Sequence, residues 1–229
     1  MVIFQIMSNM DAAALVWFIV VVGSYQVIAE WAPAESSSIV GAVQQQRVAW
    51  MRNMARREER AFDAIVLNGL GQGNAFFAST SAIVIGGLAA IMGSGEKVQK
   101  LLEQLPYVAQ SSAVLWEMKV LLLIAIFVFA FFKFAWAYRL SHYTAIMIAA
   151  TPNPIPGNEA ACDSHADRTA KLIGIAAEHA NSGLRAYYYA IAAMAWFFHP
   201  LAFAVATTWV LAILVRRDFY SRSRRILQG

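Results

Sequence analysis

The sequence predicts an all-α integral membrane protein, a helical bundle with four transmembrane helices and two amphipathic helices at the cytoplasmic or interfacial surface. Of its 229 residues, 59% are hydrophobic and only 14% are charged, whereas a soluble domain carries about 25% charged residues. The mean hydropathy is +0.52, and so little charge cannot cover a water-soluble surface. We therefore expect one membrane domain over residues 1–229.

Four apolar segments are long enough to cross the roughly 30 Å of hydrocarbon in a bilayer, which takes about 20 helical residues. We expect spans at residues 12–30, 66–92, 113–137 and 187–215. The first span follows ten residues without Lys or Arg, which is unlike a secretory signal and predicts a retained helix. The third span is the most apolar, and charged side chains at its ends can reach water.

The segments between the spans have distinct compositions. Residues 39–63 combine apolar positions with five arginines, which predicts a basic amphipathic helix lying along the lipid headgroups. Residues 151–157 hold three prolines, which predict an extended linker. Residues 159–186 are Ala-rich and predict a helix that Asn158 caps and that can continue into the fourth span.

The placement of charge leaves the topology open. With the N-terminus outside, nine Lys and Arg residues fall in cytoplasmic loops and seven on the other side, a weak preference under the positive-inside rule. A break at His199-Pro200 would instead return the last segment as a hairpin and make the distribution fourteen to two. Because the two halves of that hairpin are short for spans, a single span over residues 187–215 is the preferred interpretation.

Polar side chains within the spans form a candidate intramembrane polar site. His199 lies near the middle of the fourth predicted span, and an ionisable residue at bilayer depth is a candidate for proton transfer or ligand binding. A neutral imidazole bonded to a carbonyl that the kink at Pro200 exposes is the commoner situation. Glu117 lies about one turn inside the third predicted span. Its carboxylate either binds a cation or, more commonly, lies at the membrane–water interface. The candidate residues are His199, Glu117, Asn68, Gln72 and Ser79.

One side of the second span is almost entirely small or polar. Offsets of 4 and 7 residues place Asn68, Gln72 and Ser79 on one face, and small residues form the adjacent stripe. We expect this stripe to pack against another helix, because small residues let backbones approach closely; lining a narrow hydrated path is the alternative. The predicted packing face comprises Gly69, Gly73, Thr80, Gly86 and Gly87.

Two arginine clusters are predicted to contact anionic lipid headgroups. The chain has a pI near 9.3, but its cations lie beside apolar runs, which favours membrane lipids over nucleic acid as the partner. The clusters are Arg47, Arg52, Arg56, Arg57 and Arg60 in the amphipathic helix, and Arg216, Arg217, Arg222, Arg224 and Arg225 in the C-terminal tail.

The sequence predicts no metal, cofactor or catalytic site. Cys162 is the single cysteine, and His142, His165 and His179 lack metal-ligand spacing. No nucleophile motif occurs either. An enzyme is therefore the least favoured class of function.

Several motifs occur in order between residues 47 and 221. They are Arg47 with Trp50-Met51, Arg56 and Asp63; residues 75–80 with Gly86-Gly87; Trp116-Glu117 with Lys119; residues 130–136 with Tyr138-Arg139; Ala150 with Pro152; Gly183 with Arg185-Ala186; Trp196-Phe197 with Pro200; and Arg216-Arg217 with Phe219 and Ser221. In these motifs the chain resembles the domain of unknown function 599 family of bacterial multi-pass membrane proteins. The resemblance implies a helical protein of the bacterial inner membrane and carries no catalytic residues.

Two functions follow as hypotheses. The preferred one is a non-enzymatic scaffold or accessory subunit of a membrane protein complex or homo-oligomer, because four thin spans enclose a poor core and favour association with other membrane proteins or with further copies of the chain. The alternative is a small channel or transporter that uses the polar face of the second span. A lipid- or quinone-handling protein ranks third.

Overall fold

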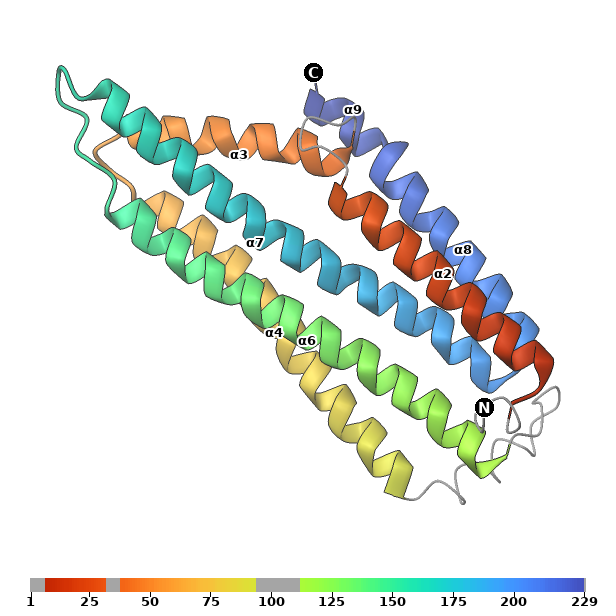
Figure 1. Cartoon of the computed structure of the whole chain (residues 1–229). Coiled ribbons are helices and arrows are strands. Elements are labelled where there is room, and N and C mark those ends of the chain that lie inside the picture. The colour runs from red at the N-terminus through yellow and green to blue at the C-terminus, as the bar shows by residue number, and fades with distance from the viewer. Residues whose placement is uncertain (1–6, 32–37, 94–111, 229) are drawn as a thin grey trace. The chain divides into compact units, whose positions relative to one another are not determined.

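The structure, a computed structural model, describes residues 7–31, 38–93 and 112–228. Over these ranges the regular structure is helical throughout and contains no strand, which confirms the predicted all-α fold (Figure 1). The elements are α2 (Asn9–Trp31), α3 (Ile39–Ala55), α4 (Ala61–Gly93), α6 (Ala113–Ala149), α7 (Glu159–Met194), the 3-10 helix η1 (Ala195–Phe197), α8 (Pro200–Phe219) and α9 (Arg222–Gln228).

Four helices are long and apolar enough to cross a membrane, as the sequence predicts. They are the segment Asn9–Ala29 of α2, and the whole of α4, α6 and α8. Two of them are longer than expected. With its 37 residues, α6 measures about 55 Å at a rise of roughly 1.5 Å per residue, so it extends well beyond the hydrocarbon of a bilayer.

The fourth predicted span, residues 187–215, is not one helix. Helix α7 continues through its first part to Met194, η1 follows, and α8 begins at Pro200 and runs back in the opposite direction (Figure 1). Proline has no N–H to donate and is favoured at the first position of a helix. The preferred sequence interpretation is therefore wrong here, and the hairpin at His199-Pro200 is the arrangement that the chain adopts.

The boundary between the basic helix and the second span also differs from the prediction. Helix α3 ends at Ala55 instead of residue 63, and its last turn is closed by the N–H of Arg56, which donates to the carbonyl of Asn53, and by the N–H of Arg57, which donates to that of Met54. Helix α4 begins at Ala61, earlier than the expected residue 66. A carboxylate in the first turn, here Asp63, favours a helix start because it lies at the positive end of the helix dipole.

The proline-rich linker between α6 and α7 is non-helical, as expected. Gly157 adopts a φ of +88°, a left-handed conformation that glycine takes without steric cost. The side-chain amide of Asn158 donates to the carbonyl of Asn153, so it closes the linker on itself just before α7 begins.

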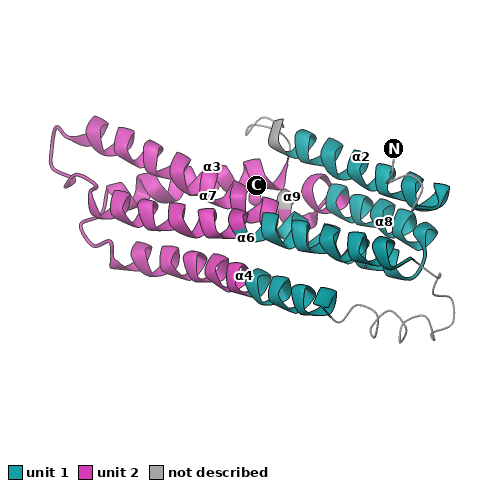
Figure 2. Cartoon of the chain, turned by 60° about the horizontal axis from the view of Figure 1, so that its bottom comes forward, with its two compact units in different colours: residues 1–32, 80–131, 184–215 teal, residues 33–79, 132–183, 216–229 magenta. Residues whose placement is uncertain are grey.

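The chain forms two compact units (Figure 2). Unit 1 consists of residues 1–32, 80–131 and 184–215, and unit 2 of residues 33–79, 132–183 and 216–229. Charge is divided unequally between them. Unit 2 holds 14 of the 18 Lys and Arg residues, whereas unit 1 is almost wholly apolar.

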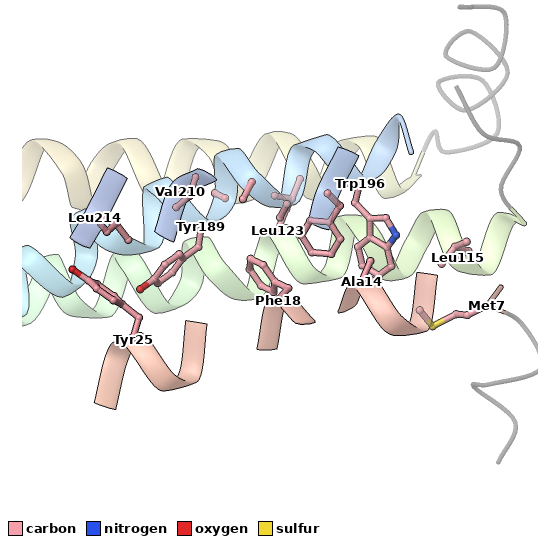
Figure 3. Close-up of a cluster of buried hydrophobic side chains, with 14 residues drawn as sticks. Met7, Ala14, Phe18, Tyr25, Leu115, Leu123, Tyr189, Trp196, Val210 and Leu214 are labelled. Atoms are coloured by element: carbon pink, nitrogen blue, oxygen red, sulfur yellow. The ribbon is translucent and has the colours of Figure 1, made fainter. Parts of the chain in front are cut away.

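Aromatic side chains from α2, α7, η1 and α8 form the core of unit 1 (Figure 3). The ring of Phe203 stacks on Trp196, with 5.0 Å between the centroids and 15° between the planes. Phe18 of α2 lies 5.0 Å from the same Phe203 ring. These contacts join the two arms of the helical hairpin to α2, so the break at Pro200 is part of the core.

The core of unit 2 lies between α3, the first part of α4, the end of α6 and the first part of α7. Its buried side chains include Met51, Met54, Leu67, Ile148 and Ile173. Helix α9 lies against α3, and the side chain of Gln46 donates to the carbonyl of Leu227. The C-terminal basic tail therefore belongs to the same unit as the basic helix α3.

Gly183 of α7 lets the ring of Phe134 in α6 approach the α7 backbone. A Cβ placed on Gly183 would lie 2.7 Å from the Cε2 atom of that ring. The ring cannot move away easily, because its other side stacks on Phe77 at a centroid distance of 5.1 Å. Gly183 is thus the residue that sets the spacing of α6 and α7 in unit 2.

We expect Gly183→Ala to destabilise the protein by about 1–3 kcal/mol, the usual cost of overpacking a filled core. Thermal unfolding in mild detergent measures this change, followed through dye labelling of the buried Cys162. Phe134→Leu should restore much of the loss in the double variant. Gly23→Ala is the matched control, since a Cβ there meets nothing within 4 Å. Equal effects of the two alanine variants would contradict this account.

Candidate functional site

Asp63 is the centre of a polar cluster in unit 2. Its side chain is fully buried in the first turn of α4. Its Oδ1 atom accepts hydrogen bonds from the indole nitrogen of Trp50 at 2.7 Å and from the guanidinium of Arg57 at 2.8 Å. The cluster ties the end of α3 and the following turn to the start of α4. Two of its members, Trp50 and Asp63, also belong to the ordered motifs of the sequence.

Asp63→Ala should lower stability by about 1–3 kcal/mol, because it leaves the indole N–H of Trp50 without its acceptor. Thermal unfolding followed at Cys162 measures the change. The matched control is Asp167→Ala, which removes a carboxylate from an exposed ion pair and should cost less than about 1 kcal/mol. An Asp63→Ala variant as stable as its control would show that the buried contact contributes nothing.

Three arginines of the basic helix and its following turn pair with carboxylates. Besides the Arg57 contact, Arg52 forms a bidentate pair with Asp167 of α7, with N–O distances of 2.8 and 3.1 Å. Arg56 lies 3.5 Å from Asp163. The hydrogen bond from Arg52 lowers the pKa of Asp167 below its ordinary value. This pair therefore contributes stability above the ordinary Asp pKa, and the contribution is lost as the pH falls through the lowered pKa.

The two remaining arginines of this cluster bind within the protein as well. The guanidinium of Arg60 donates to the carbonyls of Thr151 and Pro152 at 2.6 and 2.8 Å and so holds the linker. Arg47 donates to Gln44, and burial lowers its pKa while the charge of Glu178 opposes that shift. Contacts within unit 2 thus account for all five positions, and contact with lipid headgroups stays a prediction.

The arginines of the tail are placed differently. Arg216, Arg222 and Arg225 are exposed, whereas Arg217 donates to Asp218 at 2.8 Å. The side chain of Arg224 lies outside the described residues. The exposed members of this cluster therefore have the better geometry for the predicted lipid contacts.

Unit 1 has a buried polar cluster at the start of α2. The carboxylate of Asp11 accepts hydrogen bonds from Ser8 and, at 2.8 Å, from the indole nitrogen of Trp196. Lys119 of α6 is only 2% exposed, and its ammonium lies 5.6 Å from the centroid of the Trp196 ring. Asp11 supplies the opposite charge that acts on this ammonium. The sequence alone does not place Asp11 near Lys119, because the two residues are far apart in the chain.

The structure places His199 at the start of a helix and leaves Glu117 exposed. His199 precedes α8, where its Nδ1 atom accepts the N–H of Leu201 at 3.1 Å and its carbonyl accepts the N–H of Phe203. This is the bonding of a helix N-cap, so the imidazole lies at a turn and not at the middle of a span. Glu117 is exposed on α6. Both lie in unit 1, whereas Asn68, Gln72 and Ser79 lie in unit 2.

His199→Ala should destabilise the protein by about 1 kcal/mol through loss of the N-cap, and His199→Asn should retain most of the stability because Asn is a good N-cap. Thermal unfolding monitored by tryptophan fluorescence tests the pair. If the Asn variant lost as much stability as the Ala variant, capping would not be the role of this residue.

The predicted packing stripe of α4 faces outward from the chain. Asn68, Gln72 and Ser79 are exposed, and a Cβ added to Gly69 or Gly73 meets nothing within 4 Å. Gly86 and Gly87 are equally open, and Thr80 is half-buried. Within the described chain α4 packs through a different face, which the buried side chains of Asp63, Leu67, Ala78 and Ser81 mark. Among the residues that the structure describes, the glycines of the stripe therefore meet no other helix.

The glycine of α4 that faces α6 is instead Gly71, where an added Cβ would make ordinary van der Waals contact with Cβ of Ser141 at 3.5 Å. Small size alone does not separate Gly71 from Gly69 and Gly73 in the sequence. Positions 63, 67, 71 and 78 are buried and recur at helical spacing. In the sequence, Asp63 at the start of this series was the available sign of which face of α4 is buried.

Arg185 is named above only as part of a sequence motif, and its burial in unit 1 was not predicted. Its side chain is only 5% exposed, and its Nε atom is enclosed without a hydrogen-bond partner among the residues described. The position of this arginine in an otherwise Ala-rich and aromatic stretch of α7 was the sign in the sequence that it is buried.

Where the structure describes the chain, no group of three or more His, Cys, Asp and Glu side chains is arranged to hold a metal ion. His165 is buried with its Nε2 atom 2.7 Å from the carbonyl of Met147. Cys162 is also buried and lies 3.7 Å from the carbonyl of Pro152. His165 therefore joins α7 to the end of α6, and Cys162 packs α7 against the linker.

A family model described as "Protein of unknown function, DUF599" matches residues 13–223 of the chain. The match includes every motif singled out in the sequence and extends the resemblance to α2. Neither a curated protein nor a solved structure matches the chain.

Proposed function

Because this chain belongs to the DUF599 family, which assigns it no activity, we propose a function from its surface: a non-enzymatic scaffold or accessory subunit that associates in the membrane through α4. The outward-facing stripe of α4 carries this proposal. Two amide side chains, Asn68 and Gln72, and the adjacent Gly69 and Gly73 are exposed on a helix of span length.

The chemistry of this stripe favours a protein neighbour over lipid. Lipid tails cannot hydrogen-bond to an amide, whereas a second helix can. Exposed glycines next to such side chains allow a partner backbone to approach closely, which is how transmembrane helices associate. The neighbour is either another copy of the chain or a different membrane protein.

The distribution of charge supports an orientation. Unit 2 contains the basic helix, the linker and the C-terminal tail, and the positive-inside rule places such a concentration of arginine in the cytoplasm. We propose that the basic segments of unit 2, which are α3, the linker and the C-terminal tail, face the cytoplasm at a bacterial inner membrane, with the exposed tail arginines at anionic headgroups.

Association through α4 is tested with the double variant Gly69→Leu/Gly73→Leu. The added side chains should block close approach, so a complex of the native chain, with itself or with a protein co-purified in stoichiometric amount, should dissociate. Mass photometry in lipid nanodiscs measures the mass of the complex. Gly23→Leu is the matched control, because Gly23 of α2 is exposed and also has nothing within 4 Å of an added Cβ. A native chain that is monomeric and carries no partner would overturn the proposal.

A channel or transporter stays the alternative proposal, and one observation limits its form. Since Asn68, Gln72 and Ser79 face outward, a pore lined by them would have to lie between copies of the chain. Flux of ions or protons into liposomes that Gln72→Leu abolishes would favour it. Absence of flux under every gradient would remove it.

A further inference from the structure

Helix α4 is the least covered of the four spans that the structure describes. Only 11% of the residues in its apolar window are buried, against 22%, 28% and 28% in the other three. Its buried side chains mark the face that carries Asp63, Leu67 and Ala78. Between Ala64 and Gly93 the sequence has no charged residue. The rest of this helix is therefore an open and uncharged surface.

The exposed residues of this surface follow a seven-residue repeat, which we call the α4 seam. Ile65, Gly69, Gln72, Phe76 and Ser79 are all exposed, and the offsets between them are 4, 3, 4 and 3 residues. The same offsets continue along the helix as far as position 90, which is also exposed. A repeat of about 3.5 residues keeps one narrow seam of a helix against a partner helix over many turns.

A second spacing on the same helix is closed by the chain itself. Two glycines four residues apart, here Gly69 and Gly73, allow helices to cross closely with the opposite hand, and Phe77 is the next residue of that series. Phe77 stacks on Phe134 of α6, with 5.1 Å between the centroids, whereas Phe76 is 66% exposed. The α4 seam is therefore the spacing that stays open to a partner.

The α4 seam is complementary to a second copy of itself. Copies that share one topology in a membrane are related by an axis along the membrane normal, so α4 meets α4 in parallel and each residue lies near its own counterpart. Gln72 suits this arrangement because its amide both donates and accepts hydrogen bonds. In hydrocarbon no water satisfies such an amide. The absence of charge also means that two copies do not repel each other along the seam.

We propose that α4 pairs in parallel with α4 of a second copy along the α4 seam, with the two Gln72 amides hydrogen-bonded across the two-fold axis. The small residues Gly69 and Ser79 let the two backbones approach, and Ile65 and Phe76 fill the layers beside them. An amide within such a seam also fixes the register of the two helices. The inference rests on the proposed association through α4 and names its partner.

Cysteine cross-linking of the full chain in membranes tests the α4 seam. Cys162 is the single cysteine of the chain, so Cys162→Ala provides a background without a thiol. In this background Gly69→Cys, Phe76→Cys and Ser79→Cys should each yield a disulfide-linked dimer under mild oxidation. Leu70→Cys is the matched control, because Leu70 is 52% exposed but lies on a different face of the helix. It should yield no more dimer than the background.

The role of Gln72 is tested by the strength of the dimer in lipid. Gln72→Leu should raise the dissociation constant by roughly 3- to 30-fold, the range that corresponds to one hydrogen bond between transmembrane helices. Gln72→Asn should retain most of the affinity because it keeps the amide. Energy transfer between labelled chains diluted in liposomes measures the dissociation constant. A Leu variant that dimerises as strongly as the native chain would contradict the pairing of the amides.

The outcomes separate this inference from the proposed function. If the native chain co-purifies with a different protein that Gly69→Leu/Gly73→Leu releases, and the seam cysteines form no cross-link, the second copy is wrong and association through α4 stands. A monomeric chain with no partner overturns both. Equal cross-linking at Leu70→Cys and Phe76→Cys would show random collision and would also end the inference.

Discussion

Pro200 cannot donate a backbone hydrogen bond, and the direction of the last part of the chain depends on this missing donor. The last turn before it becomes a 3-10 helix, His199 caps the helix that follows, and α8 returns along α2 and the end of α7. Trp196 then stacks on Phe203 across the turn. The same reversal carries the basic tail into unit 2, where α9 meets α3. Consequently, the basic segments of the chain belong to one unit.

Buried charge is the second constraint on the fold. In an apolar protein each buried ion needs a partner of opposite charge or a strong hydrogen bond. Asp63 meets Trp50 and Arg57, and Asp11 meets Trp196 near Lys119. These contacts join elements that are distant in sequence, such as α2 with η1. At Arg185 the enclosed Nε atom has no hydrogen-bond partner among the described residues.

Helix α4 shows why a functional surface is harder to predict than a fold. Its small and polar stripe is visible in the sequence, but the stripe has the same composition whether it packs inside the chain or against a neighbour. The structure places a different face, from Asp63 to Ser81, against the rest of the chain. Since Gly69 and Gly73 are open, the stripe is available to a partner in the membrane.

The sequence by itself determined the helical class, the four segments of span length, the non-helical linker and the family. These features depend on local composition and on helix geometry, which the order of residues specifies directly. Only the tertiary structure decided that residues 187–215 divide at Pro200, that the charge of Asp11 acts on Lys119 and that Gly71 is the glycine of α4 that faces Ser141 of α6. The pairing of distant residues depends on which helix faces meet. Periodicity identifies the faces of each helix but not the partner of each face, so these contacts follow only from the folded chain.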